Sequence, residues 1–346
     1  MGNYYSIEYA NLWMGIKETA FRTNAHGKDT ANEAGDTFRR FPIRWDGAIK
    51  PRPLSYKVRK QRAAGKGIDF AHAYRDGYEP IKFQITGEVL DFAFIYQLCA
   101  CTTAGSYTHT YATSTTQAQA TFQMLQKIVN ITGAESEYFL YIGCKITDFI
   151  CSWNAETGRI NGTLTIECAT QITGLALTNE PTWIQTIPYY FNPLTMFVWT
   201  ATPPAGTTNP GAHTYNGFCA KWRFKFSNGQ HLRLINYLII PDKVIENYRT
   251  IELEWDWVTE EKQDYEDSQE DPQDDQDQDL VHTLSNGVNS MVMTWAKMLI
   301  EYLGSEYNYK DFYLANTYRA SLNPNQTSTL TMVETNSDTN VFYEGA

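Results

Sequence analysis

The side chains best able to do chemistry are six histidines and six cysteines, and they lie far apart along the chain. The nearest approach to a metal-ligand spacing is Cys99 and Cys101 with His109, three of the four ligands that a structural zinc site needs. The sequence has no glycine-rich phosphate loop, no His-Glu-x-x-His and no Gly-x-Ser-x-Gly. We therefore expect a protein that is not an enzyme, with no catalytic, cofactor-binding or metal-binding residues.

The cysteine usage and the start of the chain both indicate a reducing compartment. Cys144, Cys151 and Cys168 lie in strand-like segments, where a thiol usually behaves as a small buried hydrophobe. Residues 1–10 lack the basic start and apolar run of a secretory signal, and no stretch approaches the ~20 apolar residues of a transmembrane helix. We expect a cytoplasmic protein without membrane insertion.

Two segments of opposite charge are the remaining candidates for a functional site. Residues 260–279 hold eleven acids against Lys262, and residues 39–66 hold ten bases against Asp46, so the segments carry net charges of −10 and +9. The acidic run lacks the turn glycine of a calcium loop, and it has too few apolar residues to order itself. The basic segment could contact nucleic acid or dock on another subunit.

The candidate site residues are charged side chains of these two segments. They are Arg39, Arg40, Lys57, Arg59, Lys60, Arg62, Asp267, Glu270, Asp271, Asp274 and Asp275.

The elements that must position these segments are mostly strands. Residues 1–79 predict an N-terminal strand followed by an extended basic arm, and residues 80–180 predict a first β half. Ile81, Phe83 and Ile85 alternate with polar residues, the period of a half-buried strand. A short helix is expected over 91–99. A long hairpin is expected over 137–168, turning at Gly158; its first strand is apolar on both faces and so must be covered on both.

Residues 181–346 predict a second β half that includes the acidic insertion 260–279. Alternation over 218–226 leads into Asn228-Gly229, which favours a two-residue hairpin turn. A second alternating strand is expected over 251–257. Apolar residues at helical spacing from Val288 to Tyr302 predict one flanking helix over 285–303. Strands around 313–322 and 327–334 follow.

The two halves have a similar pattern. Residues 81–86 match 251–258, each followed by an expected helix, and the hairpin at Gly158 matches the pair flanking Asn323-Pro324-Asn325.

Several segments, taken in order, resemble the tail tube proteins of tailed bacterial or archaeal viruses. Residues 15–21 (GIKETAF) resemble the family's opening motif, although Arg22 stands where a glycine is usual. Residues 105–111 (GSYTHTY) and Gly143-Cys144-Lys145-Ile146 resemble two later strands, and 222–235 resembles the start of the family's second half.

The resemblance implies a mainly β fold, a β-sandwich or barrel with long hairpins and a flanking helix. Six copies would form a ring, and stacked rings would form a tube that conducts viral DNA without sequence-specific binding. The implied partners are further copies, the tape measure protein and the tail terminator. The implied location is the virion tail, with assembly in the host cytoplasm.

Charge then gains two possible roles. The acidic run could line the lumen, where bases would bind DNA through counterion release. It could instead clasp the basic arm of a neighbouring subunit, and we favour this clasp because the two charges balance and would set register. The alternative to a tail tube is a carbohydrate-binding or adhesive β-sandwich, which would carry exposed aromatic side chains on one surface.

Overall fold

The structure is a computed structural model in which the chain is described in separate ranges. These are residues 5–18, 39–41, 43–45, 55–62, 71–90, 92, 94–95, 98, 100–104, 108–112, 121–130, 136–175, 197–202, 213–215, 217–233, 243–246, 249–259, 277–285, 289–308, 313–322 and 328–335. Side chains are described in most of these strands, but not in β2, β4, β5 or β7.

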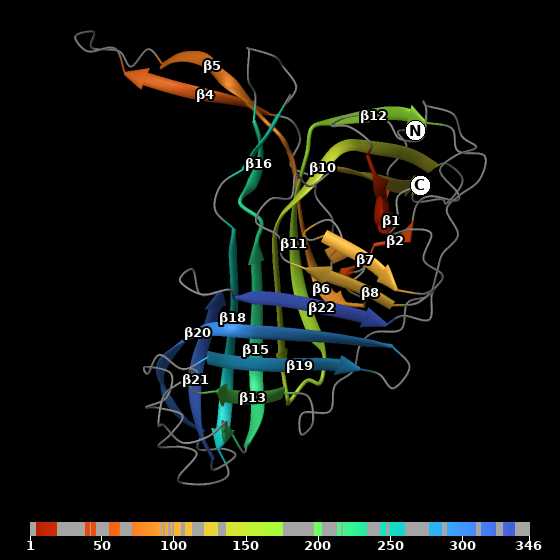
Figure 1. Ribbon diagram of the computed structural model, residues 1–346. Helices are drawn as coiled ribbons and strands as arrows, with labels where there is room; N and C mark the ends of the chain where they lie inside the picture. Colours follow the sequence, from red (N-terminus) through yellow and green to blue (C-terminus); the bar gives the residue numbers. More distant parts are fainter. Residues whose placement is uncertain are drawn as a thin grey trace.

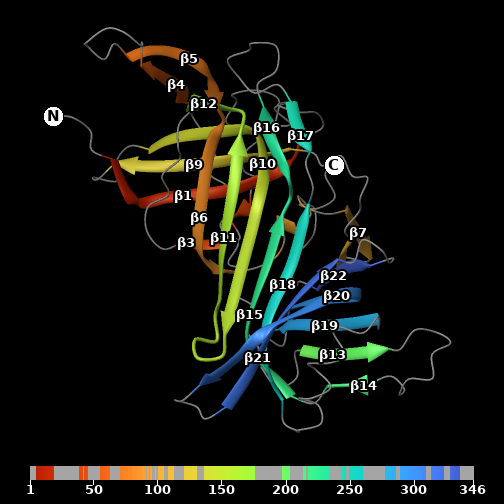
Figure 2. The same cartoon turned by 90° about the vertical axis from the view of Figure 1, so that its left-hand side faces the viewer.

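A long antiparallel sheet of eight strands forms the body of the molecule (Figures 1 and 2). In spatial order they are β3 (Ile43–Trp45), β6 (Ile81–Val89), β11 (Ile160–Cys168), β10 (Ser136–Asn154), β15 (Gly217–Ser227), β18 (Thr250–Thr259), β21 (Tyr313–Leu322) and β20 (Ser290–Asn308).

Two 19-residue strands, β10 and β20, leave this sheet and continue into two further sheets. The first half of β10 pairs with β9 (Phe122–Asn130) and β12 (Thr170–Leu175); β9 continues to β1 (Tyr5–Lys17) and then β2 (Arg39–Arg40). The first half of β20 pairs with β19 (Asp277–Ser285) and β22 (Thr329–Thr335). From there the sheet runs to β13 (Phe197–Thr202) and β14 (His213–Thr214), and on the other side to β8 (Thr108–Ala112) and β7 (Ala100–Ala104).

Two hairpins project from the same end of the molecule (Figures 1 and 2). One pairs β4 (Ser55–Arg62) with β5 (Ala71–Glu79), and the other pairs β16 (Gln230–Arg233) with β17 (Lys243–Glu246).

The core lies against one face of the long sheet, which the crossing strands cover. Alternate residues of β6 are buried, and the same holds along β15. Trp199 of β13 packs edge-on against Trp255 of β18, with ring centroids 5.4 Å apart, and Phe224 of β15 packs against Trp295 of β20 at 5.9 Å. The opposite face of the long sheet is polar.

This arrangement confirms the expected mainly β class. The pairings do not return to a starting strand, so the described strands form open sheets and not a closed barrel. The tail-tube sandwich or barrel stays a prediction. The long hairpin is confirmed, with β10 and β11 in register from Lys145 opposite Glu167 to Trp153 opposite Ile160.

The helix expected over 285–303 is wrong, because Ser285 ends β19 and residues 290–303 lie in β20. A β-bulge explains the false helical spacing: Trp295 and Met298 lie opposite Leu280 and Gln278, so three steps on β20 face two on β19. The bulge shifts the alternation by one residue. Met291, Trp295 and Met298 therefore fall at helical intervals, although they lie in a strand and are buried in the core. In the region expected to hold a short helix, the described residues show one helical turn at Phe94 and Ile95.

The hairpin expected at Asn228-Gly229 is also wrong. β15 pairs with β10 and β18, while β16 pairs with β17, so the chain does not fold back at this point. Gly229 has φ 65°, and Asn228 is buried, donating its amide to the Ile146 carbonyl (3.1 Å). The dipeptide bends a long ribbon instead of reversing it.

The expected match of the two hairpins is wrong as well. β10 and β11 correspond in length and pairing to β20 and β21, and not to the strands that flank residues 323–325.

Candidate functional site

The polar face of the long sheet carries rows of opposite charge on neighbouring strands. Alternation points Lys221, Arg223 and Lys225 of β15 away from the core. The register places them directly opposite Asp256, Glu254 and Glu252 of β18. Opposite charges at such cross-strand positions stabilise a sheet and suppress other registers.

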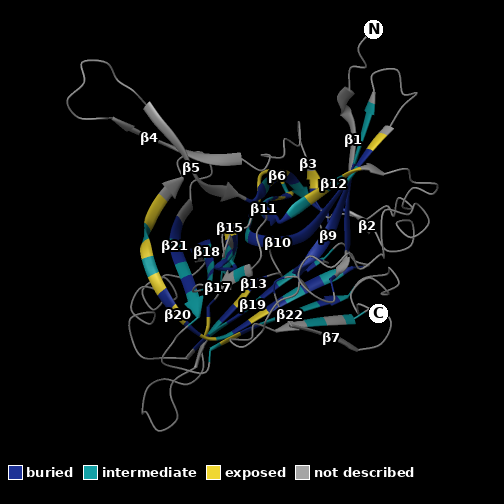
Figure 3. Ribbon diagram, turned by 90° about the horizontal axis from the view of Figure 1, so that it is seen from above, coloured by how far each residue is buried: buried dark blue, intermediate teal, exposed yellow. Residues whose placement is uncertain are grey.

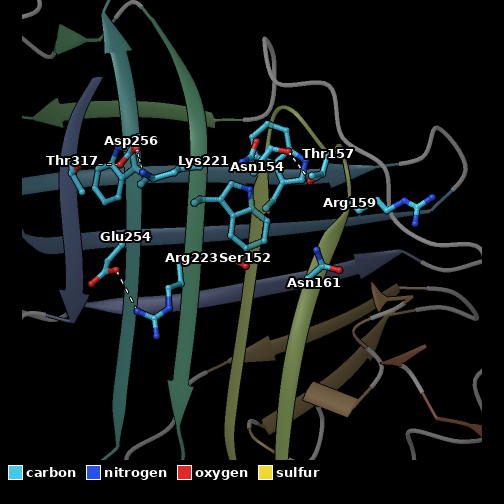
Figure 4. A pocket seen from close by; sticks show the side chains of 13 residues that line it. Ser152, Asn154, Thr157, Arg159, Asn161, Lys221, Arg223, Glu254, Asp256 and Thr317 are labelled. Atoms are coloured by element: carbon cyan, nitrogen blue, oxygen red, sulfur yellow. Dashed lines mark hydrogen bonds and ion pairs between the residues drawn. The ribbon is translucent and has the colours of Figure 1, made fainter. Parts of the chain in front are cut away.

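Each of these cross-strand pairs makes an ion pair. Lys221 Nζ lies 2.7 Å from Asp256 Oδ2, and Lys225 Nζ donates to Glu252 Oε2 at 3.0 Å. Arg223 Nη1 lies 3.6 Å from Glu254 Oε2, as Figure 4 shows.

The next two strands extend the pattern. Arg319 of β21 donates Nε and Nη2 to Glu254 Oε1, at 2.9 and 2.6 Å, and lies 3.7 Å from Glu301 of β20. Lys221 also lies 3.6 Å from Glu306 of β20. We call this set the charged ladder. Its members are Lys221, Arg223, Lys225, Arg319, Glu252, Glu254, Asp256, Glu301 and Glu306.

The ladder holds four bases and five acids, so it is close to neutral with a slight excess of negative charge. The hydrogen bond to Asp256 raises the pKa of Lys221, and the hydrogen bond to Glu254 raises the pKa of Arg319. Both bases therefore stay charged and paired across the physiological pH range.

The same principle continues toward the other end of the sheet. Lys82 of β6 lies 2.9 Å from Glu167 of β11, and Arg44 of β3 lies 3.9 Å from Glu88 of β6. The buried Glu167 also accepts from the Leu232 amide at 2.9 Å. Each of the bases named on this face thus contacts an acid of the same chain.

A shallow hollow of about 570 Å³ lies on this part of the sheet (Figure 4). Its lining includes Asn154, Thr157, Arg159 and four ladder residues, Lys221, Arg223, Glu254 and Asp256. Within the described parts of the chain, no group of three or more His, Cys, Asp or Glu side chains could hold a metal ion. The hollow thus offers polar hydrogen-bonding groups and charge, without an activated nucleophile.

A buried carboxylate joins two of the segments that carried the resemblance. Glu18, which follows β1, accepts from the Gly143 amide of β10 at 2.8 Å and from the Thr121 hydroxyl. Gly143 is at a bulge in β10 with φ 65°. Glu18 therefore satisfies an amide that the bulge removes from the ladder of strand pairs.

The sequence-predicted site residues that the structure describes lie on strands other than those of the charged ladder. Arg39 and Arg40 form β2, and Lys57, Arg59, Lys60 and Arg62 lie on β4, where only the backbone is described. Asp267, Glu270, Asp271, Asp274 and Asp275 lie outside the described residues. The clasp and the lumen lining both stay predictions.

The charged ladder was missed as a site although its signal is present in the sequence. The bases at 221, 223 and 225 and the acids at 252, 254 and 256 each occupy every second position of an alternating strand. Only their cross-strand register was absent from the sequence.

The cysteine prediction is confirmed for the three residues it named. Cys144, Cys151 and Cys168 are free and buried, and so is Cys219. Burial raises the pKa of each of these thiols, which keeps them protonated and poorly nucleophilic.

Protein-family models and curated proteins give no relative for this chain. No family model matches it, and no curated protein matches its sequence. Among the residues that the structure describes, there is no helix of the length and apolarity that a membrane crossing requires.

Proposed function

We propose that this protein is a structural virion subunit, a tail tube protein, that assembles into rings with six positions around an axis. Stacked rings form the tube through which viral DNA is delivered. The proposed partners are further copies, the tape measure protein and the tail terminator. The proposed location is the virion tail, after assembly in the host cytoplasm.

The observation that carries this proposal is the charged ladder on a broad, open sheet. Duplex DNA must slide through a tube without sticking, and every unpaired Lys or Arg on the wall would bind phosphate with release of counterions. On this face each ladder base already contacts an acid of a neighbouring strand. Such a surface suits the lumen wall.

The position of the β4–β5 hairpin indicates between which copies the proposed clasp between the basic arm and the acidic run acts. The basic β4–β5 hairpin projects from one end of the long sheet, whereas β18, which precedes the acidic run, ends near the other end (Figure 1). Within one copy the end of β18 therefore lies far from this hairpin. The clasp therefore acts between rings stacked along the tube, where opposite charges meet head to tail.

The binding-module alternative is less well supported. Among the described residues, the large hydrophobic side chains that are exposed are Val198, Leu299 and Leu303, none of them aromatic. A carbohydrate platform needs exposed aromatic rings.

Negative-stain electron microscopy of the concentrated protein tests the proposal. We expect rings or hollow tubes with a bore wide enough for duplex DNA. Monomers under every condition, with specific retention on a polysaccharide resin, would favour the binding module instead.

A further inference from the structure

The chain contains the same set of strand pairings twice. In the first half, the start of β10 pairs with β9 and β12 and its end pairs with β11. In the second half, the start of β20 pairs with β19 and β22 and its end pairs with β21. Both central strands run for 19 residues, from Ser136 to Asn154 and from Ser290 to Asn308.

Both central strands also carry a bulge of the same kind at the same place. The three steps from Tyr141 to Cys144 lie opposite two steps on β9, just as the three steps from Trp295 to Met298 lie opposite two steps on β19. The residue before the end of each bulge has positive φ, 65° at Gly143 and 54° at Lys297.

A carboxylate holds each bulge. Gly143 donates its amide to Glu18 at 2.8 Å, and Lys297 donates its amide to Asp279 at 3.0 Å. The two acids come from different strands, so the shared feature is the geometry and not a shared residue type.

The remaining strands follow the same plan. β6 pairs with β11 as β18 pairs with β21, and β3 pairs with β6 as β15 pairs with β18. Along the chain, a hairpin lies between the two members of the second of these pairs in each half: β4–β5 between β3 and β6, and β16–β17 between β15 and β18. The chain is thus two copies of one unit, side by side in the long sheet.

The joint between the two units is a β ladder. The end of β10 pairs with β15, from Asp148 opposite Ser227 to Asn154 opposite Lys221. The outer end of the second unit is the corresponding end of β20, which has β21 on one side and none of the described strands on the other. The outer end of the first unit is β3.

The side chains on this outer segment of β20 differ in burial from their counterparts on β10. Leu299 and Leu303 are 51% and 41% exposed, while Lys145, which holds the position of Leu299 in β10, is 1% exposed. Two of the three exposed large hydrophobic side chains of the described residues therefore lie on this one edge strand. Figure 3 shows β20 beside β21, with exposed stretches in yellow. An uncovered edge of this kind is a template for another chain.

The outer segment of β20 and strand β3 carry opposite charges, as β10 and β15 do at the joint. At the joint, β10 brings Asp148 and β15 brings three bases. On the outer segment of β20 lie Glu301 and Glu306, whose side chains are 64% and 72% exposed, whereas β3 brings Arg44, 67% exposed. These three side chains contact partners in their own chain but stay largely exposed, so the acidic edge of one chain attracts the basic edge of another head to tail.

We propose that the outer edge of β20 binds the β3 edge of a second copy of this chain, repeating the joint between β10 and β15. Head-to-tail contacts that close produce a ring. This inference rests on the proposed tube, whose ring has six positions, and it assigns two positions to each chain. A ring then holds three chains with threefold symmetry, in place of the six copies expected from the resemblance.

The mass of single rings tests the stoichiometry. Three chains of 39.6 kDa give about 119 kDa per ring, and six give about 238 kDa. Native mass spectrometry of rings released from tubes is expected to give the smaller mass. Rings of six chains would overturn the inference and leave the tube intact, whereas a chain that stays monomeric at all concentrations would overturn both.

A pair of variants tests the edge itself. Leu299→Glu with Leu303→Glu places charge on the outer segment of β20, where both side chains are exposed in the single chain, so the fold is retained. We expect ring formation to fall at least tenfold, at an unchanged melting temperature. The control is Thr294→Glu, an exposed position of the same strand with β19 and β22 on its two sides, which is expected to assemble normally. Normal rings from the double variant would overturn the assignment of this edge.

Discussion

At the scale of single residues, His282 shows how the core treats a titratable group. It lies on β19, fully buried, with its ring centroid 4.7 Å from that of Trp222 and 5.1 Å from that of Phe197. Burial lowers its pKa to about 3, because the aromatic surroundings cannot solvate the imidazolium ion. The side chain therefore stays neutral in the folded protein.

The pH dependence of unfolding should report this residue. In the unfolded chain His282 has an ordinary pKa of about 6.5 and binds a proton that the folded chain excludes, so stability falls as pH falls from there toward the folded pKa. Between about pH 7 and pH 5 the loss from this residue is about 2 kcal/mol. We expect His282→Leu to lose about 2 kcal/mol less unfolding free energy than the unsubstituted protein between pH 7 and pH 5, as measured by urea denaturation at both pH values. An equal loss of unfolding free energy in the two proteins would contradict this expectation.

At the scale of elements, bulges and bends decide how the long strands pass from one sheet to another. Gly143 and Lys297 each have positive φ where a 19-residue strand leaves the long sheet. The left-handed conformation costs a non-glycine residue roughly 1–2 kcal/mol. The first unit avoids this cost with glycine, and the second carries it at Lys297.

Substitutions at the two bulges are therefore expected to change the free energy of unfolding by different amounts. Gly143→Ala should lower the free energy of unfolding by about 1–2 kcal/mol, because alanine must adopt the left-handed conformation. Lys297→Gly should change it by less than about 1 kcal/mol, since relief of strain offsets the entropy of the added glycine. Urea denaturation measures both. Equal losses of unfolding free energy at the two sites would contradict the assignment of strain to Lys297.

At the scale of the whole molecule, the charged ladder is the feature proposed to face DNA. Glu252 and Glu254 neutralise three bases on two neighbouring strands. Without them the face would carry a net positive charge. Duplex DNA would then bind through counterion release.

Removal of these two acids should convert a surface that does not retain DNA into one that does. We expect the variant Glu252→Gln with Glu254→Gln to bind duplex DNA at low salt, with affinity that falls steeply as salt rises. The control compares two single variants that change the net charge equally, Glu254→Gln in the ladder and Glu137→Gln, an exposed position in the first half of β10. Equal DNA binding by the two variants in filter-binding assays would show that net charge, and not the position of the acids in the ladder, controls DNA binding.

The sequence by itself determined the β class, the long hairpin, the buried cysteines and the alternation of β6, β15 and β18. These are local or compositional properties, since burial of every second side chain is written directly into a strand. Periodicity failed where a bulge changed its phase, as in β20, and where a turn-forming dipeptide served as a bend, as at Asn228-Gly229.

Only the tertiary structure decided which strands become neighbours. The match of bases at 221, 223 and 225 with acids at 256, 254 and 252, the meeting of Glu18 with Gly143, and the two equivalent units all depend on pairing between distant segments. A ladder of backbone hydrogen bonds is nearly independent of residue type, so the sequence constrains register mainly through the sum of side-chain contacts on both faces. That sum becomes defined once the whole sheet is assembled.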